Sequence, residues 1–419
     1  MTASTQSELA VTGFTASGFE PVADAMGELH NLWPGGAGFA AYVDGELVVD
    51  LAAGFARDGI PWRQDTVTLI ASVTKGLAAM CLQLLEDRGQ LDLDEKVAAY
   101  WPEFAQNGKQ DITVRQVQLH TTGVIGLSPQ PRVVHWDGRG WDDLDAIADS
   151  LARVAPAWEP GTRYGYHAVT YGWLAGELVR RITGRTLGRF FETEIAEPLD
   201  ADVHIGSGPD VIARTAEVYE FRANDSPLSE RIAARLMFGR MRNNPLLSQA
   251  FLSDGTDSIA SASIRMLKAN DRYLAAEVPA ANGLATAKGL ARVFSVLATG
   301  GEVDGLRLLS TESVKRWSAP VQRLPDYTIT SAIPFARLLR IEERSKLGRT
   351  VGYLTNHPPG KLAKGFGPND AAVGSEGAGG QVAFADPVRR VSAGFVRSQL
   401  WPNRKASDHV VAALYKCLG

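Results

Sequence analysis

The sequence lacks several features that would point to particular classes of protein. Only two of its 419 residues are cysteines, Cys81 and Cys417, so no disulfide framework is indicated, which suits a reducing compartment. The formal charge of −4 leaves no basic excess, so we expect no nucleic-acid partner. No apolar run approaches the roughly 18 residues needed to span a bilayer.

The N-terminal segment MTASTQSELAVTGF also lacks the basic start and the continuous apolar stretch of a secretory signal. Unless processing has removed a signal, we expect a soluble cytoplasmic protein with no membrane partner. Hydrophobic residues make up 45% and charged residues 21% of the chain, which is ordinary for a globular protein. The length suits one large domain or two closely packed ones.

Both ends of the chain contain apolar runs that are interrupted by turn residues. GAGFAAYV and ELVVDLAAGFA flank Asp44-Gly45, which is a strong hairpin signal. GGQVAFADP and RVSAGFVRS repeat this arrangement around Asp386-Pro387. We expect helices over residues 20–32 and in ASDHVVAALYKCL near the C-terminus. The predicted fold class is α/β (α+β), with one antiparallel sheet built from both termini and flanked by helices.

The middle of the chain is dominated by helical periodicity. The pattern appears in LAAMCLQLLEDRG, ITVRQVQLHTTG, TYGWLAGELVRRITG and KGLARVFSVLATGG, and several of these segments end in glycine. The sequence therefore predicts an α/β sheet domain from residues 1–78 and 285–419, with a mainly helical domain over 79–284. Residues 321–370 show no clear periodicity, and we expect long loops there that border a site.

The main candidate for chemistry is Ser72-Val73-Thr74-Lys75, in TLIASVTKGLAAMCLQLLEDRG. If Ser72 begins a helix, Lys75 lies one turn later on the same face, and a serine hydroxyl needs such an adjacent base to act as a nucleophile. A lysine base requires its pKa to fall by about three units, worth roughly 4 kcal/mol, through burial and a cationic or hydrogen-bonding neighbour. Taken alone, the motif is better explained by a capping serine and a solvated lysine.

A second candidate is Tyr166, which follows the Pro160-Gly161 turn and precedes a helical pattern. Its phenol could relay a proton between the nucleophile and a leaving group, or act as a base if the lysine depresses its pKa. A packing tyrosine is the competing interpretation.

The third candidate is the glycine-rich run from Gly374 to Gly380, just before the predicted strand QVAFADP. Glycine at a strand edge lets the backbone approach a ligand closely. An N–H group there could form half of an oxyanion hole, with the N–H of Ser72 as the other half. A plain turn would have the same composition.

Together these segments resemble the serine β-lactamase and penicillin-binding protein superfamily, which is marked by Ser-x-x-Lys, Tyr-x-Asn and a late Lys-Thr-Gly or His-x-Gly. The chain looks most like the class C β-lactamases and family VIII carboxylesterases. ITVRQVQLHTTGV is similar to the family's ITVRHLLTHTSGL segment, and NGLATAKGLARVFSVLATGG and GAGGQVAFADP also match in order. The resemblance covers most of residues 20–400 and implies a β-lactamase/transpeptidase-like fold.

The resemblance also implies roles for individual residues. It makes Ser72 the acylated nucleophile, Lys75 its activator and Tyr166 the proton relay, with the backbone N–H groups of Ser72 and Ala378 as oxyanion donors. We assign substrate binding to four further residues around these positions: His167, Ser375, Glu376 and Gly377.

Two departures from the family pattern shift the expected chemistry. Ala168 stands where the family has asparagine, and Ser375 stands where it has lysine or histidine. In β-lactamases those groups bind the amide side chain and the carboxylate of the antibiotic. We therefore expect poor β-lactam turnover and favour the hydrolysis of small-molecule carboxylic esters. His167 either donates a hydrogen bond in place of the missing asparagine or points away from the site.

Other residues carry weaker signals. His120, in the segment resembling HTSGL, suits a structural role at a helix end. No histidine and acidic cluster has metal-ligand spacing, so we expect no metal and no cofactor. The Gly-x-Ser-x-Gly signature of α/β-hydrolases is absent. Trp136, Trp141 and Trp158 lie in segments that would form pocket walls, although tryptophans there are as often part of the core.

The leading hypothesis is a serine carboxylesterase that works through an acyl-enzyme on Ser72. An acyltransferase and an amide or β-lactam hydrolase would use the same residues. A ligand-binding relative that has lost turnover is the non-catalytic alternative.

Overall fold

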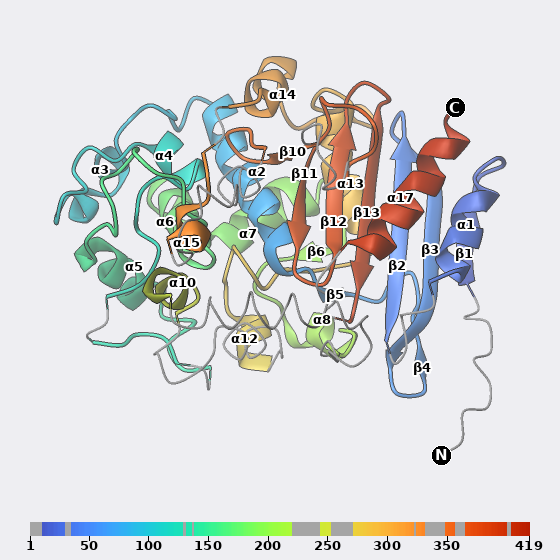
Figure 1. The fold of residues 1–419 in the computed structure, drawn as a ribbon, viewed down its shortest axis with the longest axis horizontal. Helices are drawn as coiled ribbons and strands as arrows, with labels where there is room; N and C mark the ends of the chain where they lie inside the picture. Colours follow the sequence, from blue (N-terminus) through green and yellow to red (C-terminus); the bar gives the residue numbers. More distant parts are fainter. Residues whose placement is uncertain are drawn as a thin grey trace.

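The computed structural model describes residues 11–29, 35–128, 131–135, 138–219, 244–252, 271–321, 324–331, 348–356, 365–399 and 404–419. An antiparallel sheet of eight described strands stands beside a mainly helical region (Figure 1). The sheet order is β1-β3-β2-β13-β12-β11-β10, and β4 pairs with β3. The strands are β1 (Val11–Thr15), β2 (Gly36–Val43), β3 (Glu46–Arg57), β4 (Ile60–Pro61), β10 (Leu354–Thr355), β11 (Val373–Gly377), β12 (Gln381–Asp386) and β13 (Val391–Arg397).

Strands from the two ends of the chain meet in the middle of the sheet, where β2 pairs with β13. Asp44 and Gly45 join β2 to β3, and both have positive φ angles, 52° and 88°. Positive φ at both central residues is what a type I′ hairpin turn requires. β12 and β13 form the second hairpin around Asp386-Pro387. The predicted antiparallel sheet built from both termini is therefore confirmed.

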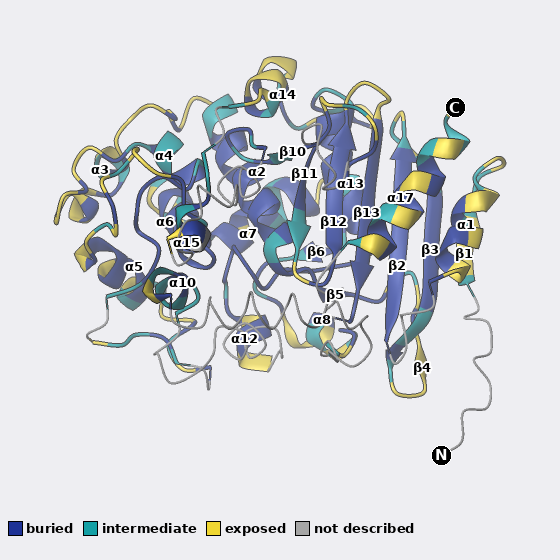
Figure 2. Ribbon diagram, in the orientation of Figure 1, coloured by how far each residue is buried: buried dark blue, intermediate teal, exposed yellow. Residues whose placement is uncertain are grey.

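Helices cover both faces of the sheet (Figures 1 and 2). On one face, α1 (Glu20–Gly27) and α17 (Lys405–Cys417) pack against Phe39, Phe384 and Phe395. On the other, α13 (Ala287–Ala298) packs against alternate positions such as Ala40 and Ala383. Because both faces are buried, the central strands read as nearly continuous apolar runs.

The helical region contains most of the remaining elements. Its helices are α2 (Thr74–Asp87), α3 (Val97–Tyr100), α4 (Val114–Gln118), α5 (Leu144–Arg153), α6 (Thr170–Thr183), α7 (Leu187–Phe191), α8 (Pro209–Ala213), α10 (Pro245–Ala250) and α12 (Asp271–Ala275). β5 (Thr68–Leu69), β7 (Leu284–Ala285) and β6 (Val203–His204) form a small three-stranded sheet in that order. β5 and β7 lie where the chain enters and leaves the helical region. Further elements are β8 (Glu302–Val303), β9 (Leu306–Arg307), α14 (Thr311–Ser318) and α15 (Tyr327–Thr330), with short helical turns at Ala71–Val73, Pro102–Phe104 and Glu192–Ala196.

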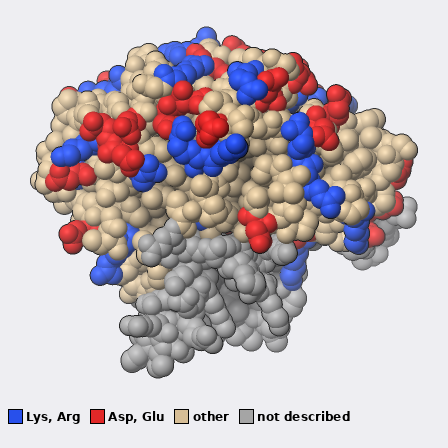
Figure 3. All heavy atoms as spheres, turned by 90° about the horizontal axis from the view of Figure 1, so that it is seen from above, with Lys and Arg blue, Asp and Glu red and all other residues tan. Residues whose placement is uncertain are grey.

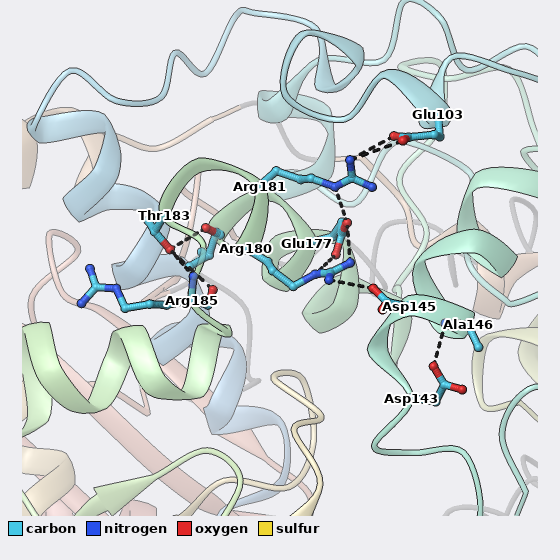
Figure 4. A network of polar contacts seen from close by, with 10 residues as sticks. Glu103, Asp143, Asp145, Ala146, Glu177, Arg180, Arg181, Thr183 and Arg185 are labelled. Atoms are coloured by element: carbon cyan, nitrogen blue, oxygen red, sulfur yellow. Dashed lines mark hydrogen bonds and ion pairs between the residues drawn. The ribbon is translucent and has the colours of Figure 1, made fainter.

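An ion-pair network holds α6 against its neighbours (Figure 4). The buried carboxylate of Glu177 accepts from Arg180 at 2.7 Å and from Arg181 at 2.6 Å. Arg180 also pairs with Asp145 on α5 at 2.7 Å, and Arg181 pairs with Glu103 at 3.2 Å. These pairs connect α6, which directly follows the segment that carries Tyr166, to α5 and to the turn at Glu103.

Several predicted elements differ in the structure. β1 is not among the predicted strands, and the helix expected over residues 20–32 ends at Gly27, with residues 30–34 outside the described residues. The helix expected in ITVRQVQLHTTG is confined to α4, because His120 adopts a φ of 56° that is incompatible with a continuing helix.

The stretch over 321–370 is only partly loop, since its described residues include α15 and β10. The predicted division into two domains stays a prediction. Its boundary after residue 78 falls inside α2, and the other falls within β7.

Among the described residues, no helix is both long enough and apolar enough to cross a lipid bilayer. On the face shown in Figure 3, basic and acidic side chains are intermixed. Many described charges form short ion pairs, such as that between Arg316 on α14 and Glu86 on α2 at 2.6 Å.

Candidate active site

Ser72 lies in a turn of 3₁₀ helix, Ala71–Val73, that leads directly into α2. Ala71 has a φ of 47°, a strained conformation for a residue with a Cβ atom. The turn is held on both sides, because the Thr74 hydroxyl donates to the Ala71 carbonyl at 2.6 Å and accepts from the Gly283 N–H at 3.0 Å. Such supported strain is typical of functional positions.

Lys75 lies one turn further along, with its side chain buried and its amine engaged at three positions. Its Nζ lies 3.3 Å from Ser72 Oγ and 2.8 Å from the carbonyl oxygens of both Ala168 and Ala280. Burial, and then the positive charge of Arg349, hold the pKa of Lys75 well below its ordinary value. A neutral amine has two N–H groups and one lone pair. With both N–H groups donated to the carbonyls, the lone pair faces Ser72.

Tyr166 approaches Ser72 from the segment before α6. Its hydroxyl donates to Ser72 Oγ at 2.7 Å, and Lys75 Nζ lies 4.7 Å from the centre of its ring. Burial raises the pKa of Tyr166 to about 12. Of the two roles left open by the sequence, this favours a protonated phenol that donates and relays protons over a phenolate base.

The glycine-rich run lies along the other side of Ser72. A Cβ atom at Gly377 would lie 2.4 Å from the Ile70 carbonyl oxygen and 3.3 Å from the Ser72 nitrogen, so only glycine allows β11 to come this close. Ser375 Oγ also donates to the Ser72 carbonyl oxygen at 3.3 Å. Ala378 follows directly after β11. Its role as an oxyanion donor stays a prediction.

Two of the other predicted binding residues have their polar groups engaged within the protein, and their binding roles stay predictions. Both ring nitrogens of His167 are engaged, one with the Gly165 carbonyl at 2.6 Å and the other with Thr122 Oγ1 at 2.7 Å. Burial lowers the pKa of His167 to about 4, so the ring is neutral and has no donor left for a substrate. Glu376 lines the site, but its carboxylate forms an ion pair with Arg404.

His120 lies nearer to the catalytic groups than its predicted structural role suggests. Its ring stacks between Tyr166, with ring centres 5.7 Å apart, and Tyr171, at 4.7 Å. Its Nδ1 accepts from the His167 N–H at 3.2 Å. Burial, followed by the charge of Arg349, keeps the pKa of His120 well below its usual range. His120 thus supports Tyr166 as a neutral ring.

Neither Trp141 nor Trp158 lines the hollow at Ser72, and both belong to the hydrophobic core. Trp141 packs on Trp173 and Tyr273 in the helical core. Trp158 lies edge-on to His167 and Tyr327, behind the segment that carries Tyr166. Trp136 lies outside the described residues.

Arg349 is a site residue that sequence reasoning missed. It lines a hollow of about 370 Å³, partly open to solvent, together with Ser72, Lys75, His120, Tyr166, Tyr171, Gly352, Tyr353, Leu354, Ser375 and Glu376. No motif marks it, and the one available signal was that residues 321–370 were expected to border a site. In the described part of the chain, no group of three or more His, Cys, Asp or Glu side chains could hold a metal ion.

The fold and these contacts define a serine hydrolase of the β-lactamase/transpeptidase fold. The sequence matches the Beta-lactamase family over residues 29–415, and the chain belongs to this family. Esterase/beta-lactamase LipL of Mycobacterium tuberculosis is 34% identical over 383 residues, which are 90% of this chain and 80% of LipL.

Solved structures give the same result. A family VIII carboxylesterase has a TM-score of 0.80 and 33% identity, with 98% of this chain and 100% of that chain covered. A penicillin-binding protein homologue from Caulobacter crescentus has a TM-score of 0.79 and 33% identity, with 97% and 100% covered. The resemblance stated from the sequence motifs is therefore confirmed at the level of family and fold.

Proposed function

We propose that this protein is a carboxylesterase that works through an acyl-enzyme on Ser72. The observation that carries the proposal is the pair of contacts on Ser72 Oγ, from Lys75 Nζ at 3.3 Å and from the Tyr166 hydroxyl at 2.7 Å. A hydroxyl held between a neutral amine and a phenol has both a proton acceptor and a proton donor within reach.

In the proposed acylation step, Ser72 Oγ attacks the ester carbonyl carbon and its proton passes to Lys75 Nζ. The carbonyl oxygen becomes an oxyanion that accepts from the N–H groups of Ser72 and Ala378. The C–O bond to the alcohol then breaks, and Tyr166 gives its proton to the leaving oxygen. The proton on Lys75 restores the phenol. In deacylation, water attacks the acyl carbon, its proton passes through Tyr166 and Lys75 to Ser72 Oγ as the bond from the acyl carbon to Oγ breaks, and the free acid leaves.

Two features favour esters over amides and β-lactams. Ala168 contributes a main-chain carbonyl to Lys75 but has no side-chain amide to offer a substrate. Ser375 carries no charge, and its hydroxyl is directed to the Ser72 carbonyl, so a β-lactam carboxylate meets no cation at the position on β11 where the family has lysine or histidine. An ester, whose alcohol leaves readily, needs only the nucleophile, the relay and the oxyanion hole. The name of the carboxylesterase relative is in keeping with ester hydrolysis, and the name of LipL includes both esterase and β-lactamase.

The experiment that tests the proposal is a series of p-nitrophenyl esters of increasing acyl length, run beside a cephalosporin, with the wild-type protein and Ser72→Ala. We expect wild-type turnover of short esters, loss of that turnover in Ser72→Ala and little cephalosporin hydrolysis. Full turnover by Ser72→Ala would contradict the mechanism, and efficient cephalosporin opening would contradict the ester preference.

Transfer of the acyl group to added alcohols faster than hydrolysis would make the protein an acyltransferase. Failure of a fluorophosphonate probe to label Ser72 would favour a non-catalytic relative.

A further inference from the structure

Arg349 is carried by a rigid turn at the edge of the active-site hollow. Residues 349 and 354 pair across this turn, and the Thr350 side chain accepts from the N–H of Tyr353 at 2.9 Å. At the tip, a Cβ atom on Gly352 would lie 2.9 Å from the Trp317 ring, so the turn is seated directly on α14. The Arg349 side chain therefore extends from a fixed point rather than from a free loop.

The guanidinium of Arg349 has no negatively charged partner among the residues that the structure describes. Its Nη2 donates to the hydroxyl of Tyr164, a neutral acceptor, and its Cζ lies 4.5 Å from the centre of that ring. Its Nε is buried and meets no acceptor within the described chain. A buried donor without an acceptor is costly, and the geometry of a guanidinium fork matches that of a carboxylate.

Among the residues that the structure describes, the acidic side chains near the hollow form no ion pair with Arg349. Glu376 is paired with Arg404. The buried Asp326 accepts from the Tyr166 N–H at 3.4 Å and from the Thr328 hydroxyl at 2.5 Å, and burial raises its pKa. The amine of Lys75, whose pKa is held well below its ordinary value, is engaged with Ser72 and two carbonyl oxygens. Arg349 thus lines the same hollow as Ser72 Oγ without an ion-pair partner among the residues that the structure describes.

We propose that Arg349 binds a carboxylate on the substrate, so that the preferred esters are anionic. This inference rests on the proposed esterase function and narrows its substrate class. The carboxylate could belong to the acyl part, as in a half-ester of a dicarboxylic acid, or to the alcohol part. Either position places a negative charge beside a fixed guanidinium in a partly buried hollow, where a charge-assisted hydrogen bond is strong.

Two matched ester pairs test the proposal and separate the two positions. The acyl pair is mono-p-nitrophenyl glutarate and its methyl ester, and the alcohol pair is 3-carboxyphenyl butyrate and its methyl ester. The measured quantity is the ratio of kcat/KM for the anionic ester to that for the neutral ester. Because each ratio is compared between protein variants, differences in intrinsic reactivity cancel.

We expect Arg349→Gln to lower this ratio for one pair by about 10- to 100-fold, mainly through KM, as loss of a charge-assisted hydrogen bond implies. Arg349→Lys keeps the charge but loses the fork, so an intermediate ratio is expected. Arg189→Gln removes an equal charge from the exposed surface of α7 and should leave both ratios unchanged. Ratios within threefold of wild type for both pairs in Arg349→Gln would overturn the proposal.

A second measurement needs no variant at Arg349. Monomethyl glutarate should slow fluorophosphonate labelling of wild-type Ser72, whereas dimethyl glutarate at the same concentration should not. Equal effects of the two compounds would also overturn the proposal. If the fluorophosphonate labels wild-type Ser72 but the protein hydrolyses none of the four esters, the proposed esterase function is wrong. The effect of monomethyl glutarate on labelling still tests whether a carboxylate binds.

Discussion

Replacing Lys75 by methionine perturbs the group on which the proposed chemistry depends most. Methionine has similar length and tolerates burial, but it has no lone pair for the Ser72 proton and no N–H groups for the carbonyls of Ala168 and Ala280. A positioned base contributes about 10²- to 10⁴-fold to the rate, which corresponds to about 3–5 kcal/mol of barrier. We expect kcat/KM for p-nitrophenyl butyrate to fall by this factor.

The same mechanism predicts the direction in which kcat/KM changes with pH. Only the neutral amine accepts the Ser72 proton, and the pKa of Lys75 is held well below its usual 10.5 by burial and by Arg349. Wild-type kcat/KM should therefore be low in acid, rise as the pH passes through this lowered pKa, and then level off. Tyr166 stays protonated over the same range, because burial raises its pKa to about 12. The rise that belongs to the amine should be missing in Lys75→Met.

The assay is initial-rate ester hydrolysis across pH, with folding checked by circular dichroism and thermal melting. This check is needed because a buried carbonyl that loses its donor costs about 1–3 kcal/mol of stability. Lys288→Met, at an exposed lysine on α13, is the matched control and should keep wild-type rates. A folded Lys75→Met protein that loses less than tenfold in kcat/KM, or that keeps the wild-type pH profile, would refute lysine as the base.

Three further substitutions test other parts of the structure. Tyr166→Phe removes the 2.7 Å hydrogen bond to the nucleophile and should lower kcat by about 10²- to 10⁴-fold in the ester assay, while Tyr171→Phe should lower it less than tenfold. Gly377→Ala places a Cβ atom 2.4 Å from the Ile70 carbonyl oxygen. We expect β11 to move away from Ser72, which would displace the proposed oxyanion donor at Ala378 and lower kcat. Glu177→Gln breaks both pairs to Arg180 and Arg181 and should lower the free energy of unfolding in urea by about 2 kcal/mol.

Each of these three predictions has a control variant and a result that would contradict it. Gly27→Ala, at a position where the nearest atom lies at an ordinary 3.7 Å, should leave kcat unchanged. Glu192→Gln breaks an exposed ion pair and should change stability by less than about 0.5 kcal/mol. Equal kcat for Tyr166→Phe and Tyr171→Phe would contradict the relay. Wild-type kcat in Gly377→Ala would contradict the close approach of β11, and equal urea midpoints for the two glutamate variants would contradict a structural role for the α6 network.

Local sequence patterns predicted much of the fold because short-range chemistry decides those features. Asp44-Gly45 accommodates the two positive φ angles of a tight hairpin, and Gly184 ends α6 in the left-handed conformation. β1 and the early end of α4 were not predictable in this way. An edge strand depends on pairing with β3, and the break at His120 depends on packing against two tyrosine rings.

The spacing of Ser72 and Lys75 along one helical turn was readable from the sequence by itself, as was the order of the segments that carry Tyr166 and the glycine-rich turn. The tertiary structure decided the electrostatic state of the site. The carbonyls that take up the Lys75 amine come from residues 168 and 280, and the charge that lowers its pKa comes from Arg349. These groups are distant in the chain, and a pKa depends on burial and on neighbours in space, so no local pattern encodes them.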